Sequence, residues 1–149
     1  METNVRLMVV LKKLTITLMN SLGKNLAELG LSGSSYPILA HLNAVGRVKT
    51  QELGDVALIT SGTITHMVSK LVKEGYVRKD QDIEDKRIFW VEITEKGRIT
   101  FNKINEEHMK YLNFLLDEFT EDEKVAFIEQ MKYIGKNIEN KIKNEVEYK

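Results

Sequence analysis

One short stretch breaks the helical spacing of apolar residues that runs through the rest of this chain. Within "IFWVEI", residues 88–93, strongly apolar side chains occur at every second position, which is typical of a half-buried β-strand. Pairing this strand with "YVRKD", residues 76–80, leaves a polar, flexible hairpin tip at residues 81–86. The chain is therefore predicted to be mainly α-helical with one small β-hairpin, and the place of that hairpin among the helices constrains the fold.

Four helices are predicted before the hairpin and two long helices after it, because apolar residues recur there at spacings of three and four. The predicted ranges are residues 5–29, 35–45, 49–59, 61–73, 95–116 and 121–142. Gly30 suits the end of the first helix, and a Ser34 cap places Pro37 in the first turn of the second. The "TEDE" capping box at residues 120–123 opens the last helix. This order predicts a winged helix-turn-helix, flanked by helices too long for its own core.

Composition limits the possible functions. A chain of 149 residues with 42% hydrophobic content suits one domain, 1–149, with a core of ordinary size. The absence of cysteine excludes disulfides, thiolate nucleophiles and cysteine-ligated zinc. A formal net charge of zero argues against bulk coating of nucleic acid or membranes, but it permits a local basic surface. Without a membrane-length apolar run or a signal-peptide cleavage region, we expect a cytoplasmic protein with no membrane contact.

The fourth predicted helix has an unusual outer face. Apolar residues at i, i+3, i+4 and i+7, starting from Ile64, face the core. The opposite face carries short hydroxyls, a glycine, a histidine and lysines: Ser61, Gly62, Thr63, Thr65, His66, Ser69, Lys70 and Lys73. Short side chains at a helix N-terminus can approach bases and phosphates in a major groove about 12 Å wide. We predict that this face binds DNA. The alternative is an ordinary capped helix start with a solvated face.

The hairpin adds positive charge beside this helix, since Arg78, Lys79, Lys86 and Arg87 gather on it. An arginine at a wing tip can enter the minor groove of DNA, whose negative potential favours it. We therefore predict DNA contacts from Arg78, Lys86 and Arg87. Asp85 is predicted to brace Arg87 while DNA is absent; alternatively, it is a turn residue in a polar loop.

The segment "LVKEGYVRKDQDIEDKRIFWVEITEKG", residues 71–97, resembles the signature of MarR-type regulators. The matching positions are Gly75 to Val77, Asp85 with Arg87, and the start of the next helix at Ile93, Thr94 and Gly97. The resemblance covers the whole chain in element order. It implies a homodimer that reads a pseudo-palindromic operator in double-stranded DNA. Residues 31–98 would form the DNA-binding lobe, and residues 1–30 and 99–149 would form the dimerisation helices.

Apolar residues of the last two helices independently favour a dimer, because they exceed what one small winged lobe can cover. The predicted interface residues are Leu112, Leu115, Phe119, Phe127, Met131, Ile134 and Ile138. Two DNA-binding lobes would then contact half-sites about 34–36 Å apart. The alternative is an intramolecular pair of helices.

The resemblance also implies a small-molecule effector at the junction between the dimerisation helices and the DNA-binding lobe. The residues predicted there are Met8, Leu11, Tyr36, Leu39, His41, Phe101, Ile104 and His108. Tyr36 and His41 offer hydrogen bonds to a phenolic oxygen in an apolar pocket. "SGTITHMVSKL", residues 61–71, resembles the branch that represses genes for quinone and catechol resistance, so a phenolic or quinone-like ligand is expected. The alternative is a plain hydrophobic core.

Three rival functions are weighed against a ligand-responsive repressor. A metal-responsive regulator would use Glu107 and His108, with His41 nearby, but Leu112 stands where an i+4 histidine would complete a helical metal pair. We predict no metal and no cofactor. An enzyme is not expected, because the three histidines have no nucleophile motif, phosphate loop or HExxH spacing beside them. A helical module that binds protein through the winged lobe remains an alternative.

Overall fold

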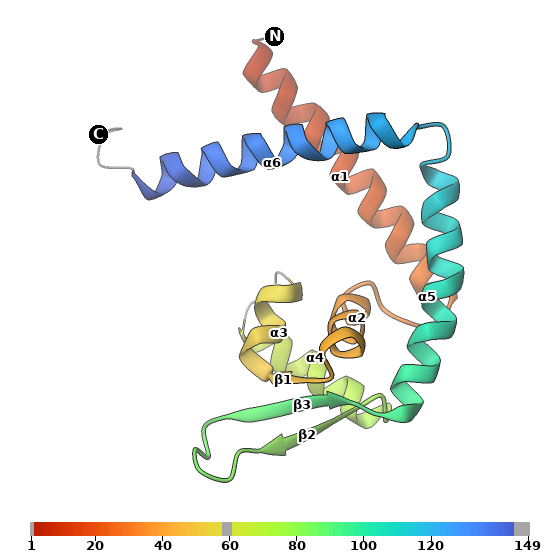
Figure 1. The fold of residues 1–149 in the computed structure, drawn as a ribbon, viewed down its shortest axis with the longest axis vertical. Coiled ribbons are helices and arrows are strands. Elements are labelled where there is room, and N and C mark those ends of the chain that lie inside the picture. The colour runs from red at the N-terminus through yellow and green to blue at the C-terminus, as the bar shows by residue number, and fades with distance from the viewer. Residues whose placement is uncertain (1, 58–60, 145–149) are drawn as a thin grey trace. The chain divides into compact units, whose positions relative to one another are not determined.

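The computed structural model of this protein describes residues 2–57 and 61–144 (Figure 1). In chain order the elements are α1 (Thr3–Glu28), α2 (Ser35–Val45), β1 (Arg47–Lys49), α3 (Thr50–Ala57), α4 (Ser61–Lys73), β2 (Val77–Gln81), β3 (Phe89–Ile93), α5 (Glu95–Leu115) and α6 (Glu121–Lys143). The predicted fold class, a mainly α-helical winged helix-turn-helix with long flanking helices, is confirmed. The predicted end of the third helix, beyond Ala57, lies outside the described residues.

The sheet has three antiparallel strands, where the sequence predicted only the hairpin pair of β2 and β3. β3 lies in the middle, and the order is β1-β3-β2. β1 has only three residues, too few for an alternating pattern to be recognised in the sequence. It fixes the start of α3 beside β3, and the Thr50 hydroxyl donates to the Phe89 carbonyl at 3.1 Å.

Strand alternation sorts the side chains of the sheet onto two faces. The face toward the core carries Val48, Val77, Lys79, Phe89, Val91 and Ile93. The outer face carries Arg47, Lys49, Arg78, Asp80, Trp90 and Glu92. Two adjacent cations of β2, Arg78 and Lys79, therefore point to opposite sides of the sheet.

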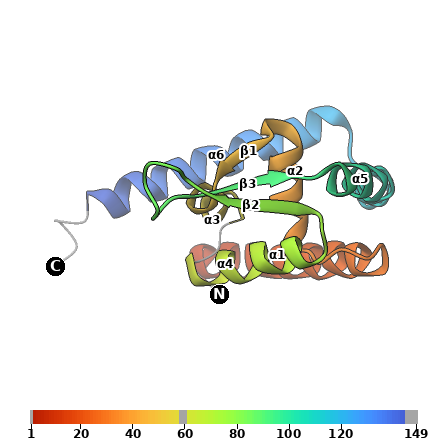
Figure 2. The ribbon, with the colours of Figure 1, turned by 90° about the horizontal axis from the view of Figure 1, so that it is seen from below.

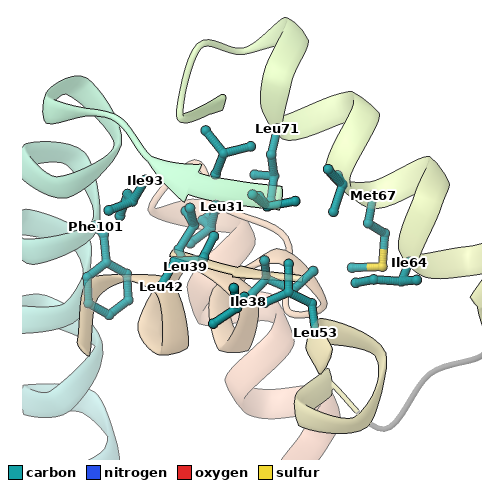
Figure 3. Packing of buried hydrophobic residues seen from close by; sticks show 14 of the residues in the cluster. Leu31, Ile38, Leu39, Leu42, Leu53, Ile64, Met67, Leu71, Ile93 and Phe101 are labelled. Carbon is teal, nitrogen blue, oxygen red and sulfur yellow. The ribbon is translucent and has the colours of Figure 1, made fainter. Parts of the chain in front are cut away.

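The hydrophobic core lies where α2, α3, α4 and the sheet meet (Figure 3). Its fully buried side chains include Ile38, Leu39, Leu42, Leu53, Val68, Leu71 and Val91. The inner face predicted for the fourth helix is confirmed, since Ile64, Met67, Val68 and Leu71 are all buried. Burial of large aliphatic side chains stabilises the fold by roughly 1.5–3 kcal/mol each. The packing also fixes the direction of the outer face of α4.

The connection from α1 to α2 agrees with the prediction at one end only. Gly30 ends α1 with φ +91°, a backbone conformation that favours glycine. Ser34 was predicted to cap α2, but its side chain makes no capping hydrogen bond because its own backbone is already helical. Ser32 takes the capping role, since its Oγ accepts from the Ser35 N–H at 3.2 Å. Pro37 lies in the first turn, as predicted.

The start of α5 is tied to the turn before β2. Thr94 Oγ1 accepts from the Gly97 N–H at 3.0 Å, which is the predicted cap, and donates to the Gly75 carbonyl at 2.7 Å. A Cβ on Gly97 would overlap the backbone carbonyl of Tyr76. The threonine and glycine of the "ITEKG" motif therefore have structural roles. Thr94 caps α5, and Gly97 lets α5 approach the turn before β2.

The chain divides into two compact units, Met1–Leu112 and Asn113–Lys149. The second unit contains α6, which opens with the predicted capping box: Thr120 Oγ1 accepts from the Glu123 N–H, and the Glu123 carboxylate accepts from the Thr120 N–H. No side chain in residues 121–143 is buried. The boundaries predicted at residues 30/31 and 98/99 stay predictions. Among the helices within residues 2–57 and 61–144, none is long and apolar enough to cross a membrane.

Candidate nucleic-acid interface

The outer face of α4 is the first part of the candidate site. Seven of the predicted DNA contacts on it are exposed: Gly62, Thr63, Thr65, His66, Ser69, Lys70 and Lys73. Ser61 begins the helix, but its side chain lies outside what the structure describes. Because the opposite face of α4 is held in the core, these residues form one continuous polar surface along the helix.

Ser69 and Lys70 of this surface each have a partner close by in the chain. Ser69 Oγ donates to the Thr65 carbonyl at 2.9 Å, one turn earlier in the helix. Lys70 Nζ lies 3.9 Å from the Glu74 carboxylate, and both side chains are well exposed. Exposed ion pairs of this kind contribute about 0–1 kcal/mol, so Lys70 can exchange its partner for a phosphate at little cost.

The wing carries the second part of the site. Arg87 donates to Asp85 through Nε at 3.1 Å and through Nη2 at 3.2 Å, and the Arg87 backbone N–H donates to the same carboxylate. The Arg87 side chain is 91% exposed despite this pair. The hydrogen bonds from Arg87 hold the pKa of Asp85 below its usual value. The contact expected between these two residues is thus present, and the guanidinium remains accessible from solvent.

Asp82 holds the tip of the wing in place, which sequence reasoning missed. Its Oδ1 accepts from the backbone N–H groups of Glu84 and Asp85, at 2.9 and 3.0 Å, and its Oδ2 accepts from Trp90 Nε1 at 2.8 Å. These bonds, led by the one from Trp90, lower the pKa of Asp82 to about 2. The tip predicted to be flexible is therefore closed by an acceptor that the sequence shows only as one more loop aspartate. In Figures 1 and 2 the wing tip lies at the end of the hairpin away from α5.

Arg78 and Lys86 are placed differently from Arg87. Arg78 lies on the outer face of the sheet and donates to Glu92 Oε2 through Nε at 3.0 Å and Nη2 at 2.6 Å. The hydrogen bond and charge of Glu92 raise the pKa of Arg78. Lys86 lies at the tip, where its Nζ donates to the Asp82 carbonyl at 3.2 Å. Of these three cations, Arg78 faces away from the side of the sheet on which α4 packs.

A groove of about 290 Å³ separates α4 from the wing. Its walls come from the start of α3, the first turn of α4 and both strands of the wing: Thr50, Gln51, Ile64, Thr65, Lys79, Arg87 and Phe89. Sequence reasoning predicted DNA contacts for Thr65 and Arg87. It counted Lys79 among the hairpin cations without predicting a contact for it, and it did not include Gln51. The missing signal was β1, because without that strand the start of α3 has no known position beside the hairpin.

A second group of polar residues lies between α1, α2 and α5. The rings of Tyr36 and His108 pack edge to face with centroids 4.8 Å apart. Tyr36 donates its hydroxyl hydrogen to Asn105 Oδ1 at 2.5 Å, and His108 Nδ1 lies 2.7 Å from Asn25 Oδ1. Burial lowers the pKa of His108 and raises that of Tyr36. The two asparagines, which sequence reasoning missed, give the phenol hydroxyl and the imidazole Nδ1 one hydrogen-bond partner each.

Only part of the predicted effector pocket comes together here. Leu39, Phe101 and Ile104 are buried in the adjoining core, beside Tyr36 and His108. Met8 and Leu11 do not join them within one chain. Asn25 touches His108, and Met8 precedes it by enough helix to lie roughly 25 Å away, at 1.5 Å per residue. His41 follows Tyr36 by five residues and therefore points to a different side of α2.

The groups considered for metal binding do not gather. No cluster of three or more His, Asp or Glu side chains that could hold a metal ion lies within residues 2–57 and 61–144. His108 instead faces Asn25, and Glu107 accepts from Lys110 Nζ at 2.8 Å.

Comparison with known proteins agrees with this geometry. Residues 36–113, more than half of the chain, match the family described as the winged helix DNA-binding domain. The chain belongs to this family of winged helix DNA-binding proteins. It is 27% identical over 136 residues to the HTH-type transcriptional regulator MhqR of Bacillus subtilis (strain 168), and the match covers 91% of this chain and 94% of MhqR.

Three solved structures share the fold, each at 20% identity. AbsC, a MarR family regulator from Streptomyces coelicolor, gives a TM-score of 0.83 and covers 94% of this chain and 97% of its own. The organohalide-sensing regulator RdhR with bound 2,4-dichlorophenol gives 0.81, covering 92% and 82%. A mutant MarR from E. coli complexed with operator DNA gives 0.72, covering 85% and 94%. The family match defines a DNA-binding protein, in agreement with the prediction that the chain is not an enzyme, and the proteins it resembles are named as transcriptional regulators, including members of the MarR family.

Proposed function

We propose that this regulator is a homodimeric repressor that binds a pseudo-palindromic operator and releases it when a small phenolic or quinone-like molecule binds. The observation that carries the DNA-binding part is the exposed outer face of α4 beside a wing that presents Arg87. Short hydroxyls and His66 would meet base edges in the major groove, and Lys70 and Lys73 would meet phosphates. The related MarR that was solved with operator DNA supports this assignment.

Within the proposed contact set, Arg87 would enter the minor groove and Lys86 would meet the adjacent backbone. Asp85 would hold Arg87 in an extended pose until DNA replaces it as a partner. Arg78 is left out of the proposed contacts, because it lies on the outer face of the sheet, away from the side on which α4 packs.

Exposed apolar side chains on the long helices support the homodimer. α1 buries Leu26 alone, and α6 buries none of its residues within the described chain. The proposed interface residues are Leu112, Leu115, Phe119, Phe127, Met131, Ile134 and Ile138; of these, Phe119, Phe127 and Ile138 are at least half exposed. Apolar surface of this extent usually marks an association site. A two-fold dimer would carry two copies of α4 to successive major grooves, about 34–36 Å apart.

The proposed effector site is the junction of Tyr36 and His108 with the apolar side chains around them. A phenol could replace the Tyr36 hydroxyl as the hydrogen-bond partner of Asn105, or the Asn25 oxygen as the partner of His108. Either exchange would alter contacts that join α1 and α5 to α2, and hence to the DNA-binding lobe. A ligand that favours such a state would shift the dimer away from the spacing that fits the operator. The dichlorophenol bound to the similarly folded RdhR supports this ligand class.

Fluorescence anisotropy with labelled DNA from immediately upstream of the gene tests the proposal. The expected result is binding that survives excess unrelated competitor DNA and moderate salt, and that is reversed by a chlorophenol, a catechol or a benzoquinone. Binding that disappears with competitor would contradict the operator assignment and favour a protein-binding wing. Competitor-resistant binding that none of these compounds reverses would retain the DNA-binding function and refute the effector class.

A further inference from the structure

The groove between α4 and the wing has a defined place in any complex that uses both elements. If α4 lies in a major groove and Arg87 reaches the neighbouring minor groove, one sugar-phosphate strand separates the two. That strand has to cross the surface between α4 and the wing. The surface at this point is the groove described above, whose lining includes Gln51, Thr65, Lys79 and Phe89.

The groups that line this groove are chemically complementary to a DNA backbone. Lys79 and Arg87 supply positive charge, and Thr65 and Gln51 supply hydrogen-bonding groups. Phe89 and Ile64 supply an apolar wall, which suits the carbon face of a deoxyribose. Lys79 Nζ lies 4.4 Å from the Phe89 ring centroid. No carboxylate within residues 2–57 and 61–144 forms an ion pair with Lys79, whereas its neighbour Arg78 is paired with Glu92.

We propose that this groove is the track in which the operator's sugar-phosphate backbone lies, with Lys79 and Gln51 contacting phosphates and Phe89 packing on a deoxyribose. Strand alternation thus divides two adjacent cations by role: Lys79 binds DNA, and Arg78 stabilises the sheet. The proposal rests on the proposed DNA-binding mode of α4 and the wing. It adds Gln51 and Phe89 to the contacts and gives Lys79, one of the cations gathered on the hairpin, a defined phosphate contact.

A salt titration of the full-length protein tests the assignment of Lys79. Each lysine that neutralises a phosphate adds about 0.9 to the slope of log Kd against log salt concentration. Lys79→Gln is expected to reduce this slope by about one per protomer. A backbone contact reads no sequence, so affinity for operator and for unrelated DNA should fall by the same factor. Lys79→Arg should restore most of the slope, which a purely structural role would not predict.

Lys49→Gln is the matched control, because Lys49 is a lysine of the same sheet on its outer face, over the Trp90 ring. Its slope should equal that of the unaltered protein. An unchanged slope in Lys79→Gln, with specific binding intact in the unaltered protein, would overturn the track while leaving the DNA-binding function standing. Absence of specific binding by the unaltered protein would instead refute the function on which the track rests.

Operators with a single neutral methylphosphonate linkage then locate the contact. Scanning this linkage along one strand should show a position, between the major-groove and minor-groove contacts, where it weakens the unaltered protein but not Lys79→Gln. Such non-additivity identifies partners in direct contact. If the two changes weaken binding additively at every position, Lys79 does not meet a phosphate, and the proposal fails.

Discussion

Trp90 Nε1 donates a hydrogen bond to Asp82 Oδ2 at 2.8 Å and thereby joins the first residue after β2 to the start of β3. The other oxygen of Asp82 accepts from two backbone N–H groups of the tip, one of them that of Asp85. Asp85 in turn holds Arg87. The position of the exposed arginine therefore depends on an aspartate that does not touch it.

Replacing Asp82 should weaken operator binding even though Asp82 contacts no DNA in the proposed complex. Asp82→Ala removes all three acceptor bonds, so the tip loosens and Arg87 pays an added ordering cost on binding. We expect operator affinity to fall several-fold. The emission of Trp90, the single tryptophan of the chain, should shift because its indole loses its partner.

Asp80→Ala is the control for that change, because Asp80 is a neighbouring exposed aspartate on β2 without a bond to the tip. It should leave the operator affinity nearly unchanged, and the affinity alone is compared because Asp80 lies directly across the sheet from Trp90 and its removal alters the surroundings of the indole. If Asp82→Ala shifts the emission but binds the operator as the unaltered protein does, the wing tip does not position Arg87.

The two arginines of the wing should differ in their effect on DNA binding. Arg87→Ala is expected to weaken operator binding by about fivefold to 150-fold, since a specific groove contact is worth about 1–3 kcal/mol. Arg78→Ala should change affinity less than threefold but lower the thermal unfolding midpoint slightly, because Glu92 loses its partner. Anisotropy on the operator, with a thermal melt of each variant, measures both. Equal losses of affinity would show that the outer face of the sheet also meets DNA.

Gly97 should tolerate no side chain. In Gly97→Ala the new Cβ overlaps the Tyr76 carbonyl, so α5 has to move away from the turn that Thr94 ties to it. Overpacking of this kind costs about 1–3 kcal/mol of unfolding free energy. Gly135→Ala, in α6, is the control, because a Cβ there meets nothing within 4 Å, and helix propensity predicts a gain of about 0.5–1 kcal/mol. Urea unfolding of both variants tests this; equal stabilities would refute the steric explanation.

Spacing predicted the elements whose periodic pattern extends over several turns. The inner face of α4 could be predicted because Ile64 and Leu71 are separated by two full turns, and the core then fixes the outer face. β1 could not be predicted, since three residues carry no usable period. The groove could not be predicted either, because β1 brings the start of α3 to β3. The position of Arg78, in contrast, could have been predicted. Side chains alternate along a strand, so the residue after the buried Val77 lies on the outer face of the sheet.

The effector junction was only partly predictable for a different reason. A resemblance locates a region of the fold, but it gives no distances, so Met8 was grouped with residues roughly 25 Å along the helix from it. The sequence did contain a signal for the two asparagines. Asn25 adjoins the buried Leu26, and Asn105 adjoins the buried Ile104, each on a helix that faces the core. Buried polar groups need partners, and a search for such pairs would have found them.

Protonation of His108 should destabilise the protein in mildly acidic solution. Burial lowers its folded pKa below the unfolded value of about 6.5, so the unfolded chain binds the proton more readily. The contribution of neutral His108 to stability is therefore fully present above about pH 6.5 and declines as the pH falls below it. The side chains of α1 and α2 that contact its ring, Asn25 and Tyr36, carry no charge at these pH values to offset the imidazolium.

Thermal melts between pH 7.5 and 5 measure this effect. We expect the unfolding midpoint of the unaltered protein to decrease toward pH 5, and His108→Asn, which has no titrating ring, to show a flatter profile despite a lower midpoint at pH 7.5. His41→Gln is the matched control, since it removes another histidine of the unit Met1–Leu112 and leaves the buried ring of His108 in place. A slope that persists in His108→Asn and vanishes in His41→Gln would assign the pH dependence to α2 instead of to the junction of α1 and α5.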